Sequence, residues 1–335
     1  MYFNQHETHY NIFPSNIYLF LISQVVAQDG DRTNNELQKD LGKCTNFKPR
    51  SGHDAEEMHN FVDNLNFEDV QRYVMFLSFA RAGHSWIGSV LDAAPNALVA
   101  NEYDTISTFM KNRRNMTQDM LFKELAKNSF LCGKYGRIQV YNYSIPGLWQ
   151  GKLGDGKTIE VIGDKKGGIT MVLLSSFGKP WKDKHAAEAL EKFLQDFRDF
   201  VKVPLRVVIV LRNPFDIIAT QHLRSGRKRI DSILLLNRYE RIMWVSENLF
   251  EPKEVHVMTM ESFASDTERE LKLLCEFVGI QCPSNMIQKV NNLTHHTPHS
   301  TYGLVEWRKD QVMEINRFIV TYLSTYGYRP MYSGV

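Results

Sequence analysis

A short apolar run followed by a basic, glycine-containing turn carries the clearest chemical signal in the sequence. Residues Val74–Phe79 have the composition of a buried parallel strand, and the turn Arg81–Trp86 leads into a segment with helical spacing that stops at Pro95. Such a strand, turn and helix start direct backbone N–H groups and the positive end of a helix dipole at one point. Arg81 adds a forked donor, and His84 and Ser85 add side-chain donors. The pattern predicts a site for a phosphate-like or sulfate-like group.

Charged residues also follow two other predicted strands. The apolar segment Ala97–Ala100 is followed by Glu102, and a strand predicted over Thr158–Gly163 is followed by Asp164 and Lys165. Because the carboxyl ends of parallel strands line the ligand crevice of open α/β sheets, we expect Glu102 to lie close to the anion site. Its alternatives are a surface carboxylate or a structural partner of Arg81. The two lysines at 165 and 166 precede paired glycines and suggest a second anion contact, with an exposed turn as the alternative.

The most hydrophobic strand candidate is the continuous β-branched run that ends at Leu211. Its composition indicates burial on both faces. Arg212 lies at its exit and Thr220 lies eight residues further on, in a predicted helix. Both side chains could therefore face one ligand group.

The elements that must position these residues alternate between strand and helix. A fifth strand is predicted at Val255–Met260, and helices are predicted at 106–132, 169–177, 181–201, 215–221, 230–249, 266–278 and 313–326. Alternation with about five strands implies an α/β fold of three layers, with a central parallel sheet and helices on both faces. Residues 291–302 form a loop rich in His and Thr.

Composition and missing motifs exclude several classes of function. The 335 residues carry 40 Lys and Arg against 38 Asp and Glu, a net charge of +2, which argues against bulk nucleic-acid binding. The pattern G-x-x-x-x-G-K-[ST] is absent, and no acidic Mg²⁺ partner is obvious at another strand end, so a metal-dependent NTPase is disfavoured. No Cys/His spacing typical of zinc occurs, and we expect no metal.

The sequence of the N-terminal region indicates a targeting segment and a leader instead of part of the globular domain. An apolar stretch over residues 12–27 ends in small residues like a signal peptide, although no Lys or Arg precedes it. It is shorter than a comfortable membrane span of about 20 residues. We expect a signal peptide or anchor at 1–28, a leader or stem at 29–71 and the globular domain at 72–335. An early buried strand or a disordered leader is the alternative for the first segment.

Sequons and cysteines favour the secretory pathway, with the protein luminal or secreted; a cytoplasmic location is the alternative. Glycosylation triplets begin at Asn115, Asn142 and Asn292, which makes a glycoprotein the expectation. Four cysteines, at 44, 132, 275 and 282, allow two disulfides. Cys275 lies in an apolar helical pattern typical of a buried free thiol, and could bridge to Cys282 only if the chain turns back. Membrane contact is expected only through an N-terminal anchor.

Two motifs together resemble those of sulfotransferases that use 3′-phosphoadenosine 5′-phosphosulfate (PAPS). The run Arg81-Ala82-Gly83-His84-Ser85-Trp86 is similar to their 5′-phosphosulfate loop, commonly [KR]-S-G-[ST]-[ST]-[WF]. Arg212-Asn213-Pro214 followed by Thr220 is similar to their 3′-phosphate motif, and 255–280 resembles their late strand–helix unit. The resemblance covers 72–330. Ala82 and Thr220 each replace a usual Ser, and His84 replaces a usual Ser or Thr.

The resemblance implies a P-loop-like sulfotransferase domain that moves a sulfuryl group from PAPS to an acceptor hydroxyl. Arg81 and the run from Leu91 to Glu102 are similar to the Golgi carbohydrate and tyrosylprotein branches, where a Glu at this spacing is the general base. Asp164-Lys165 resembles the family's strand-end pair, whose Lys stabilises the bridging oxygen; Asp164 and His84 remain candidate bases. The implied acceptor is a glycan, a tyrosine-containing protein or a small alcohol such as a sterol. A protein that binds nucleotide or glycan without turnover is the alternative from another class.

Overall fold

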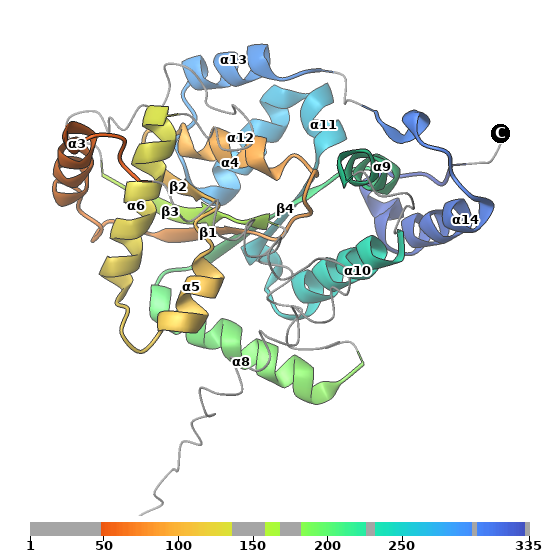
Figure 1. Cartoon of the computed structure of the whole chain (residues 1–335), viewed down its shortest axis with the longest axis horizontal. Coiled ribbons are helices and arrows are strands. Elements are labelled where there is room, and N and C mark those ends of the chain that lie inside the picture. The colour runs from red at the N-terminus through yellow and green to blue at the C-terminus, as the bar shows by residue number, and fades with distance from the viewer. Residues whose placement is uncertain (1–47, 136–157, 168–181, 226–231, 297–299, 332–335) are drawn as a thin grey trace, which may run out of the picture.

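The computed structural model describes residues 48–135, 158–167, 182–225, 232–296 and 300–331 (Figure 1). The predicted signal peptide, the helix predicted at 169–177, Cys44 and the sequon at Asn142 lie outside the described residues. Within these ranges no helix is both long enough and apolar enough to cross a membrane.

Five parallel strands form one sheet in the order β2-β3-β1-β4-β5. The strands are β1 Arg72–Phe76, β2 Ala97–Asn101, β3 Val161–Lys165, β4 Leu205–Leu211 and β5 Val255–Thr259. The predicted α/β fold with a parallel sheet is therefore confirmed, and the basic turn follows the central strand. Since every strand runs in the same direction, the predicted site residues leave the sheet at one edge.

The third strand begins and ends later than predicted. It was expected at 158–163, whereas β3 includes Asp164 and Lys165, which pair with Ala100 and Asn101 of β2. Charged residues are almost never fully buried unless they are paired. A prediction from composition therefore places the end of the strand before Asp164 and Lys165. Here both side chains are buried, at 4% and 1% exposure, because partners from other elements reach them.

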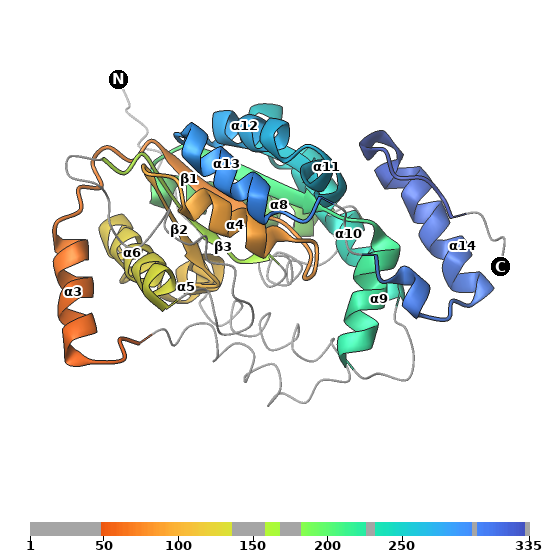
Figure 2. The same cartoon turned by 90° about the horizontal axis from the view of Figure 1, so that it is seen from above.

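Helices cover both faces of the sheet and complete the three layers (Figures 1 and 2). One face carries α5 Thr105–Asn112, α6 Gln118–Tyr135, α8 Lys184–Val201, α9 Pro214–Ser225, α10 Ser232–Asn248 and α14 Lys309–Phe318. The other carries α4 His84–Asp92, α11 Met260–Ser265, α12 Thr267–Val278 and α13 Ser284–Leu293. The strands alternate accordingly: Tyr73 and Met75 of β1 pack into the first layer, and Val74 and Phe76 pack into the second.

The folded domain begins earlier than residue 72. Part of the stretch predicted as a leader forms α3, Gly52–Asp63, which packs on α6. Met58 and Val62, four residues apart, are buried on one side of this helix, and the rings of Phe61 and Phe130 lie 5.2 Å apart. The segment looks polar overall because its remaining faces are exposed, which hides a narrow apolar stripe.

The cysteine near the end of α12 is not a free thiol, contrary to the simpler expectation. Cys275 and Cys282 form a disulfide with their Cα atoms 6.2 Å apart. The chain turns back between them at Gly279, whose φ is +79°, a left-handed conformation that glycine adopts without steric cost. Among the described cysteines, Cys132 is buried outside this disulfide, and its thiol donates to Oδ1 of Asn128 at 3.5 Å.

The C-terminal region contains more breaks than the predicted single helix at 313–326. The α-helical part is α14, and it continues as a π-turn at Ile319–Leu323 and 3₁₀ turns at Ser324–Tyr326 before Gly327. Further 3₁₀ turns occur at Pro252–Glu254 and Tyr302–Leu304. Helix α13, Ser284–Leu293, includes the first three residues of the loop predicted at 291–302, and the 3₁₀ turn at Tyr302 includes its last residue, so this loop is shorter than predicted.

Candidate active site

The basic turn after β1 has the backbone of an anion-binding loop. Arg81 and Gly83 have φ values of +80° and +93°, and Gly83 is the N-cap of α4 without any side-chain cap. The first N–H groups of a helix have no partner within the helix, so they are available to a ligand at this end. The φ of +93° favours glycine at position 83, and a Cβ there would lie 2.5 Å from Sδ of Met260, so a larger residue would also have to displace that side chain.

His84 is buried at the first position of α4. Its side chain is 6% exposed, and its Nδ1 atom has no hydrogen-bond partner within the described part of the chain. Burial, and then the charge of Lys165, lower the pKa of His84 to about 3, so its imidazole is neutral at neutral pH. A Cβ on residue 167 would lie 2.8 Å from Nε2 of His84, so the imidazole depends on a glycine after the lysine pair.

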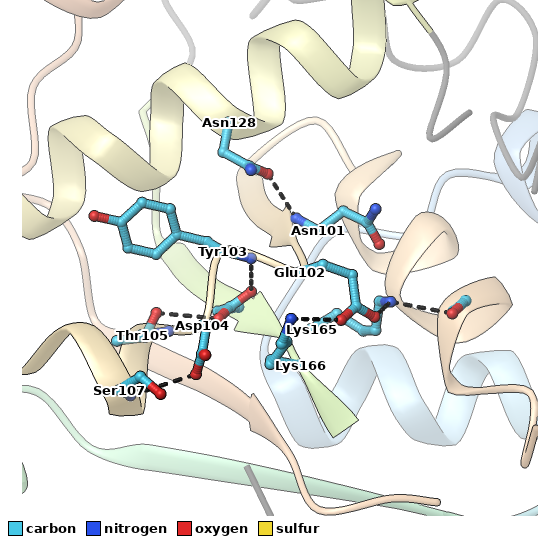
Figure 3. Close-up of polar contacts among 11 residues, drawn as sticks. Asn101, Glu102, Tyr103, Asp104, Thr105, Ser107, Asn128, Lys165 and Lys166 are labelled. Atoms are coloured by element: carbon cyan, nitrogen blue, oxygen red, sulfur yellow. Dashed lines mark hydrogen bonds and ion pairs between the residues drawn. The ribbon is translucent and has the colours of Figure 1, made fainter. Parts of the chain in front are cut away.

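Glu102, Lys165 and Lys166 form the charged centre of the site. The Glu102 carboxylate lies between the two ammonium groups: Oε1 contacts Nζ of Lys165, and Oε2 lies 3.1 Å from Nζ of Lys166 (Figure 3). Lys165 also donates to Oγ of Ser85, in the basic turn, at 3.0 Å. The lysine side chains are 1% and 3% exposed, whereas that of Glu102 is 25% exposed. The partner of Glu102 is thus the lysine pair rather than Arg81.

A left-handed backbone turn aims Glu102 at the lysines. Strand β2 ends at Asn101, and Glu102 has a φ of +61° while its N–H donates to the carbonyl of Lys165 at 3.0 Å. This conformation costs about 1–2 kcal/mol for a residue with a Cβ. The structure keeps this conformation because Lys165 at the end of β3 and Lys166 directly after it both pair with the carboxylate. Such strained residues are common at functional sites.

The charge state of Glu102 follows from these contacts. Burial alone would raise the pKa of its carboxyl, but Lys165 and Lys166 outweigh burial and lower that pKa to about 2. Glu102 is therefore ionised at neutral pH. A carboxylate held by two ammonium groups is a weak base, and its basicity must increase when one of the lysines moves to another anion.

Asp164, the second candidate base, has both oxygens occupied by a neighbouring chain segment. Oδ1 accepts from the N–H of Tyr103 at 3.2 Å, and Oδ2 accepts from the N–H and the hydroxyl of Thr105 at 2.9 and 3.2 Å. These contacts join β3 to the start of α5. In this structure Asp164 anchors the segment that follows Glu102.

Asp164 also predicts a pH dependence of stability. Burial raises the pKa of its carboxyl from 3.8 to about 6, so between these values the group titrates in the unfolded chain but stays protonated in the folded one. The contribution of Asp164 to the free energy of unfolding is therefore fully present below pH 3.8 and is lost as pH rises through about 6, at about 1.4 kcal/mol per pH unit. Asp164→Asn removes this dependence. Urea unfolding at pH 4 and pH 7 should show wild type losing stability relative to the variant, and parallel pH dependences would contradict the prediction.

Side chains beyond the site hold the end of β2. The N–H of Asn101 donates to Oδ1 of Asn128 on α6 at 2.7 Å (Figure 3). Further back, Oδ1 of Asp92 accepts from the N–H of Val99 at 2.6 Å and from the hydroxyl of Ser129 at 2.7 Å. The strand that carries Glu102 is therefore fixed to α4 and to α6 by buried polar contacts.

The segment after β4 has the residues and hydrogen bonds that are usual at a helix N-terminus. Oδ1 of Asn213 accepts from the N–H of Phe215 at 3.0 Å, and Pro214 is the first residue of α9, where its missing N–H has no cost. The N–H of Asn213 donates to Oε1 of Glu261 at 2.9 Å, and Oε2 of Glu261 accepts from Tyr328 at 2.6 Å. These contacts determine where the chain at Arg212 leaves the sheet.

Arg212 and α9 also hold the basic turn. Nη1 of Arg212 donates to the carbonyl of Arg81 at 3.1 Å, and Nε2 of Gln221 donates to the carbonyl of Ala80 at 3.2 Å. Because β1 and β4 are neighbours in the sheet, the two predicted anion motifs meet at its edge. The structure therefore brings together Arg212 and the first motif, which lie far apart in the sequence.

The hydroxyl predicted in the second motif has a partner that sequence reasoning missed. Oγ1 of Thr220 lies 2.9 Å from Oγ1 of Thr301, in the His-rich and Thr-rich loop. Asp216 on α9 fixes this loop: its carboxylate accepts from the N–H of Thr301 at 2.5 Å, the N–H of Tyr302 at 3.0 Å and the hydroxyl of Ser300 at 3.1 Å. The 81-residue separation explains why no local pattern indicates Thr301.

The predicted residues therefore form two adjoining groups. Ser85, Lys165 and Glu102 make direct contacts, His84 interacts electrostatically with the last two, and Arg212 joins the turn at Arg81. Ala82 is fully buried and contributes packing. Lys166 is noted in the sequence only as one of two consecutive lysines, and no role of its own is predicted for it there. Across the described ranges, no group of three or more His, Cys, Asp or Glu side chains could hold a metal ion.

Comparisons with known proteins give low similarity at the level of sequence. No family model matches the chain, and no curated protein matches it. Among solved structures, the sulfotransferase STF9 from Mycobacterium avium has 13% identity and a TM-score of 0.46, with 96% of this chain and 94% of that chain covered. A mouse sulfotransferase, SULT7A1, complexed with PAP has 12% identity and a TM-score of 0.36, covering 80% and 88%. A sulfotransferase from Alicyclobacillus acidocaldarius has 14% identity and a TM-score of 0.41, covering 78% and 98%.

Proposed function

We propose that this protein is a sulfotransferase that moves a sulfuryl group from PAPS to an acceptor hydroxyl. The observation that carries the proposal is the ion pair between the half-buried Glu102 and the buried Lys165, which also donates to Ser85 of the basic turn at the carboxyl edge of the sheet. The pair combines a group that can accept a proton with a group that can stabilise a leaving oxygen. The function rests on this site and not on the structural comparisons.

The residues of the site fit the phosphosulfate end of the donor. The uncapped start of α4 provides backbone N–H groups, and Arg81 and Lys165 provide positive charge. The buried Nδ1 of His84 lacks a partner within the described ranges, so this position has an unused hydrogen-bonding atom for a ligand. By analogy with phosphoryl transfer, the protein mainly positions the reactants and stabilises charge.

The contacts of Lys165 suggest how donor and base are coordinated. Its ammonium group contacts Ser85 in the turn and Glu102 beyond it, so it can shift towards an anion held by the turn. That shift would weaken its hold on Glu102 and raise the basicity of the carboxylate. Glu102 then accepts the proton of the acceptor hydroxyl, while Lys165 and Arg81 stabilise the charge that develops on the leaving phosphate.

Arg212, Thr220 and Thr301 are the proposed site for the 3′-phosphate. Arg212 is a forked donor that also holds the first motif. The hydroxyl of Thr220 adds one donor from α9 when Thr301, in the loop fixed by Asp216, donates to it. The two phosphate-binding groups lie next to each other because β1 and β4 are adjacent.

Arg212→Ala is expected to weaken binding of the product adenosine 3′,5′-bisphosphate by about 10–100-fold, because a hydrogen bond to a charged group contributes about 1.5–3 kcal/mol. Isothermal titration calorimetry measures the affinity. Gln221→Ala is the matched control, since it removes the neighbouring contact to the turn at Ala80 without removing a charge, and it should have a smaller effect. Unchanged affinity in Arg212→Ala would contradict the 3′-phosphate assignment.

The acceptor is proposed to be a carbohydrate or a protein tyrosine in the secretory pathway. The disulfide between Cys275 and Cys282 supports an oxidising compartment, and the sequon residues Asn115 and Asn292 are exposed. Arg81 and Glu102 support the same branches through the resemblance of the first motif. The alternative acceptor is a small alcohol such as a sterol, and this alternative goes with a cytoplasmic location of the protein.

Incubation with sulfur-labelled PAPS and a panel of glycans, tyrosine peptides and sterols tests the function. Transfer to one acceptor class identifies the substrate, and Glu102→Gln serves as the inactive comparison. Binding of adenosine 3′,5′-bisphosphate without transfer to any member of the panel would favour a nucleotide-binding protein without turnover. Expression of the full chain in a secreting cell line, followed by removal of N-glycans, tests the proposed compartment separately.

A further inference from the structure

Lys166 is a buried cation that the proposed reaction has not yet used. Its side chain is 3% exposed, and its Nζ lies 3.1 Å from Oε2 of Glu102 (Figure 3). Burying an ammonium group is costly unless it is paired, so a lysine at this position needs a compensating anion. Glu102 provides one, although Lys165 already contacts its other oxygen.

The backbone allows two consecutive lysines to reach one carboxylate. Consecutive residues within a strand point to opposite faces of a sheet, but β3 ends at Lys165, so Lys166 is free of this alternation. The left-handed turn at Glu102 then places the carboxylate between the two Nζ atoms (Figure 3). Two ammonium groups thus share the carboxylate of Glu102.

The two lysines differ in what lies on their other side. Lys165 donates to Ser85 in the anion-binding turn. Lys166 instead interacts electrostatically with Asp104 and Asp164, the acidic residues at the start of α5 and the end of β3. Lys165 therefore faces the donor, whereas Lys166 faces the acidic groups that anchor the segment after Glu102.

We infer that Lys166 is a positioning residue that keeps Glu102 oriented and ionised when Lys165 moves to the donor. The inference rests on the proposed function and deepens it. Without Lys166, movement of Lys165 would leave the carboxylate half-buried and without a cation beside it. With Lys166, the second oxygen stays held while the first becomes available to the acceptor hydroxyl.

Lys166→Met tests the inference through the pH dependence of turnover. The charged and titratable groups that interact with Glu102 are Asp164, Lys165 and Lys166 at the end of β3 and His84 from α4. Removing Lys166 should raise the pKa of Glu102 above its value of about 2. The acid limb of the pH profile, which is the fall of kcat/KM at low pH as Glu102 is protonated, should therefore move to higher pH by about one unit or more. Lys166→Arg should restore the wild-type limb, whereas an unchanged limb in folded Lys166→Met would overturn the inference.

The matched control is Lys134→Met, which removes a lysine paired with Asp54 at 2.5 Å and with Glu57, on the packing contact between α3 and α6. This variant can lose stability but should leave the acid limb unchanged. If Lys166→Met does not fold, Lys166→Gln keeps a polar group without the charge and should show the same shift. An acid limb that stays at its wild-type position in Lys166→Gln would overturn the inference equally.

A second readout does not need turnover. Carbon-13 labelling of the glutamate carboxyls, with Glu102→Gln identifying the signal, follows the titration of Glu102 directly by NMR. Adenosine 3′,5′-bisphosphate should raise the titration midpoint of Glu102 more in Lys166→Met than in wild type, and equal changes would overturn the inference. A wild-type protein without transferase activity would instead reject the proposed function, and the apo-protein titration would still measure the effect of Lys166.

Discussion

Glu102→Gln is expected to lower kcat for sulfuryl transfer by about 10²–10⁴-fold, the usual contribution of a general base. The amide has nearly the shape of the carboxylate but cannot accept the proton of the acceptor hydroxyl at neutral pH. The substitution also removes the negative charge that balances the two buried lysines. Affinity for adenosine 3′,5′-bisphosphate should therefore stay the same or increase. Steady-state kinetics and calorimetry on the same preparation separate the two effects.

The control for this variant is Glu268→Gln, which removes a carboxylate that contacts Lys272 at 2.6 Å on the exposed surface of α12. Turnover by Glu268→Gln should match wild type, since exposed pairs contribute little to stability. A Glu102→Gln enzyme that keeps most of its turnover would move the base to another residue. Asp164 and His84 would then be the candidates. Burial raises the pKa of Asp164 to about 6, which favours it as a base, but both of its oxygens accept hydrogen bonds. Nδ1 of His84 lacks a partner in the described structure, but the pKa of its imidazole is lowered to about 3.

Lys165→Met is expected to lower kcat by about 10²–10³-fold, the usual loss when one preorganised donor to a developing negative charge is removed. Methionine has a similar length but cannot donate to the leaving oxygen or to Ser85. Because Lys166 still contacts Glu102, the carboxylate retains one cation and the protein should fold. Rates measured with saturating PAPS at several pH values report the loss of the charge.

The comparison of Lys165→Met with Lys166→Met distinguishes the two lysines. Lys165→Met should lose kcat over the whole pH range, whereas the loss in Lys166→Met should concentrate at acidic pH, where Glu102 begins to be protonated. A loss below threefold in Lys165→Met would contradict its assignment to the leaving group. Thermal unfolding of both variants checks that a change in folding does not cause the difference.

Much of the fold follows from short-range patterns in the sequence. The apolar run before Arg81, the β-branched strand before Arg212 and the apolar stripe of α8 are local features, and local periodicity is what distinguishes strands from helices. The sequence also showed which strands end in charged residues. The position of β3 was less predictable, since burial of Asp164 and Lys165 depends on partners from β2 and α5.

By itself, the sequence determined that a basic, glycine-containing turn follows a buried strand and that Glu102 and Lys165 lie at strand ends. Tertiary structure alone decided how they meet. The adjacency of β2 and β3 places Glu102 between Lys165 and Lys166, and the adjacency of β1 and β4 brings Arg212 to the carbonyl of Arg81. Strand order is set by long-range packing and chain crossovers rather than by local propensity, so residues distant in sequence acquire their partners, charge states and proposed roles only when the sheet assembles.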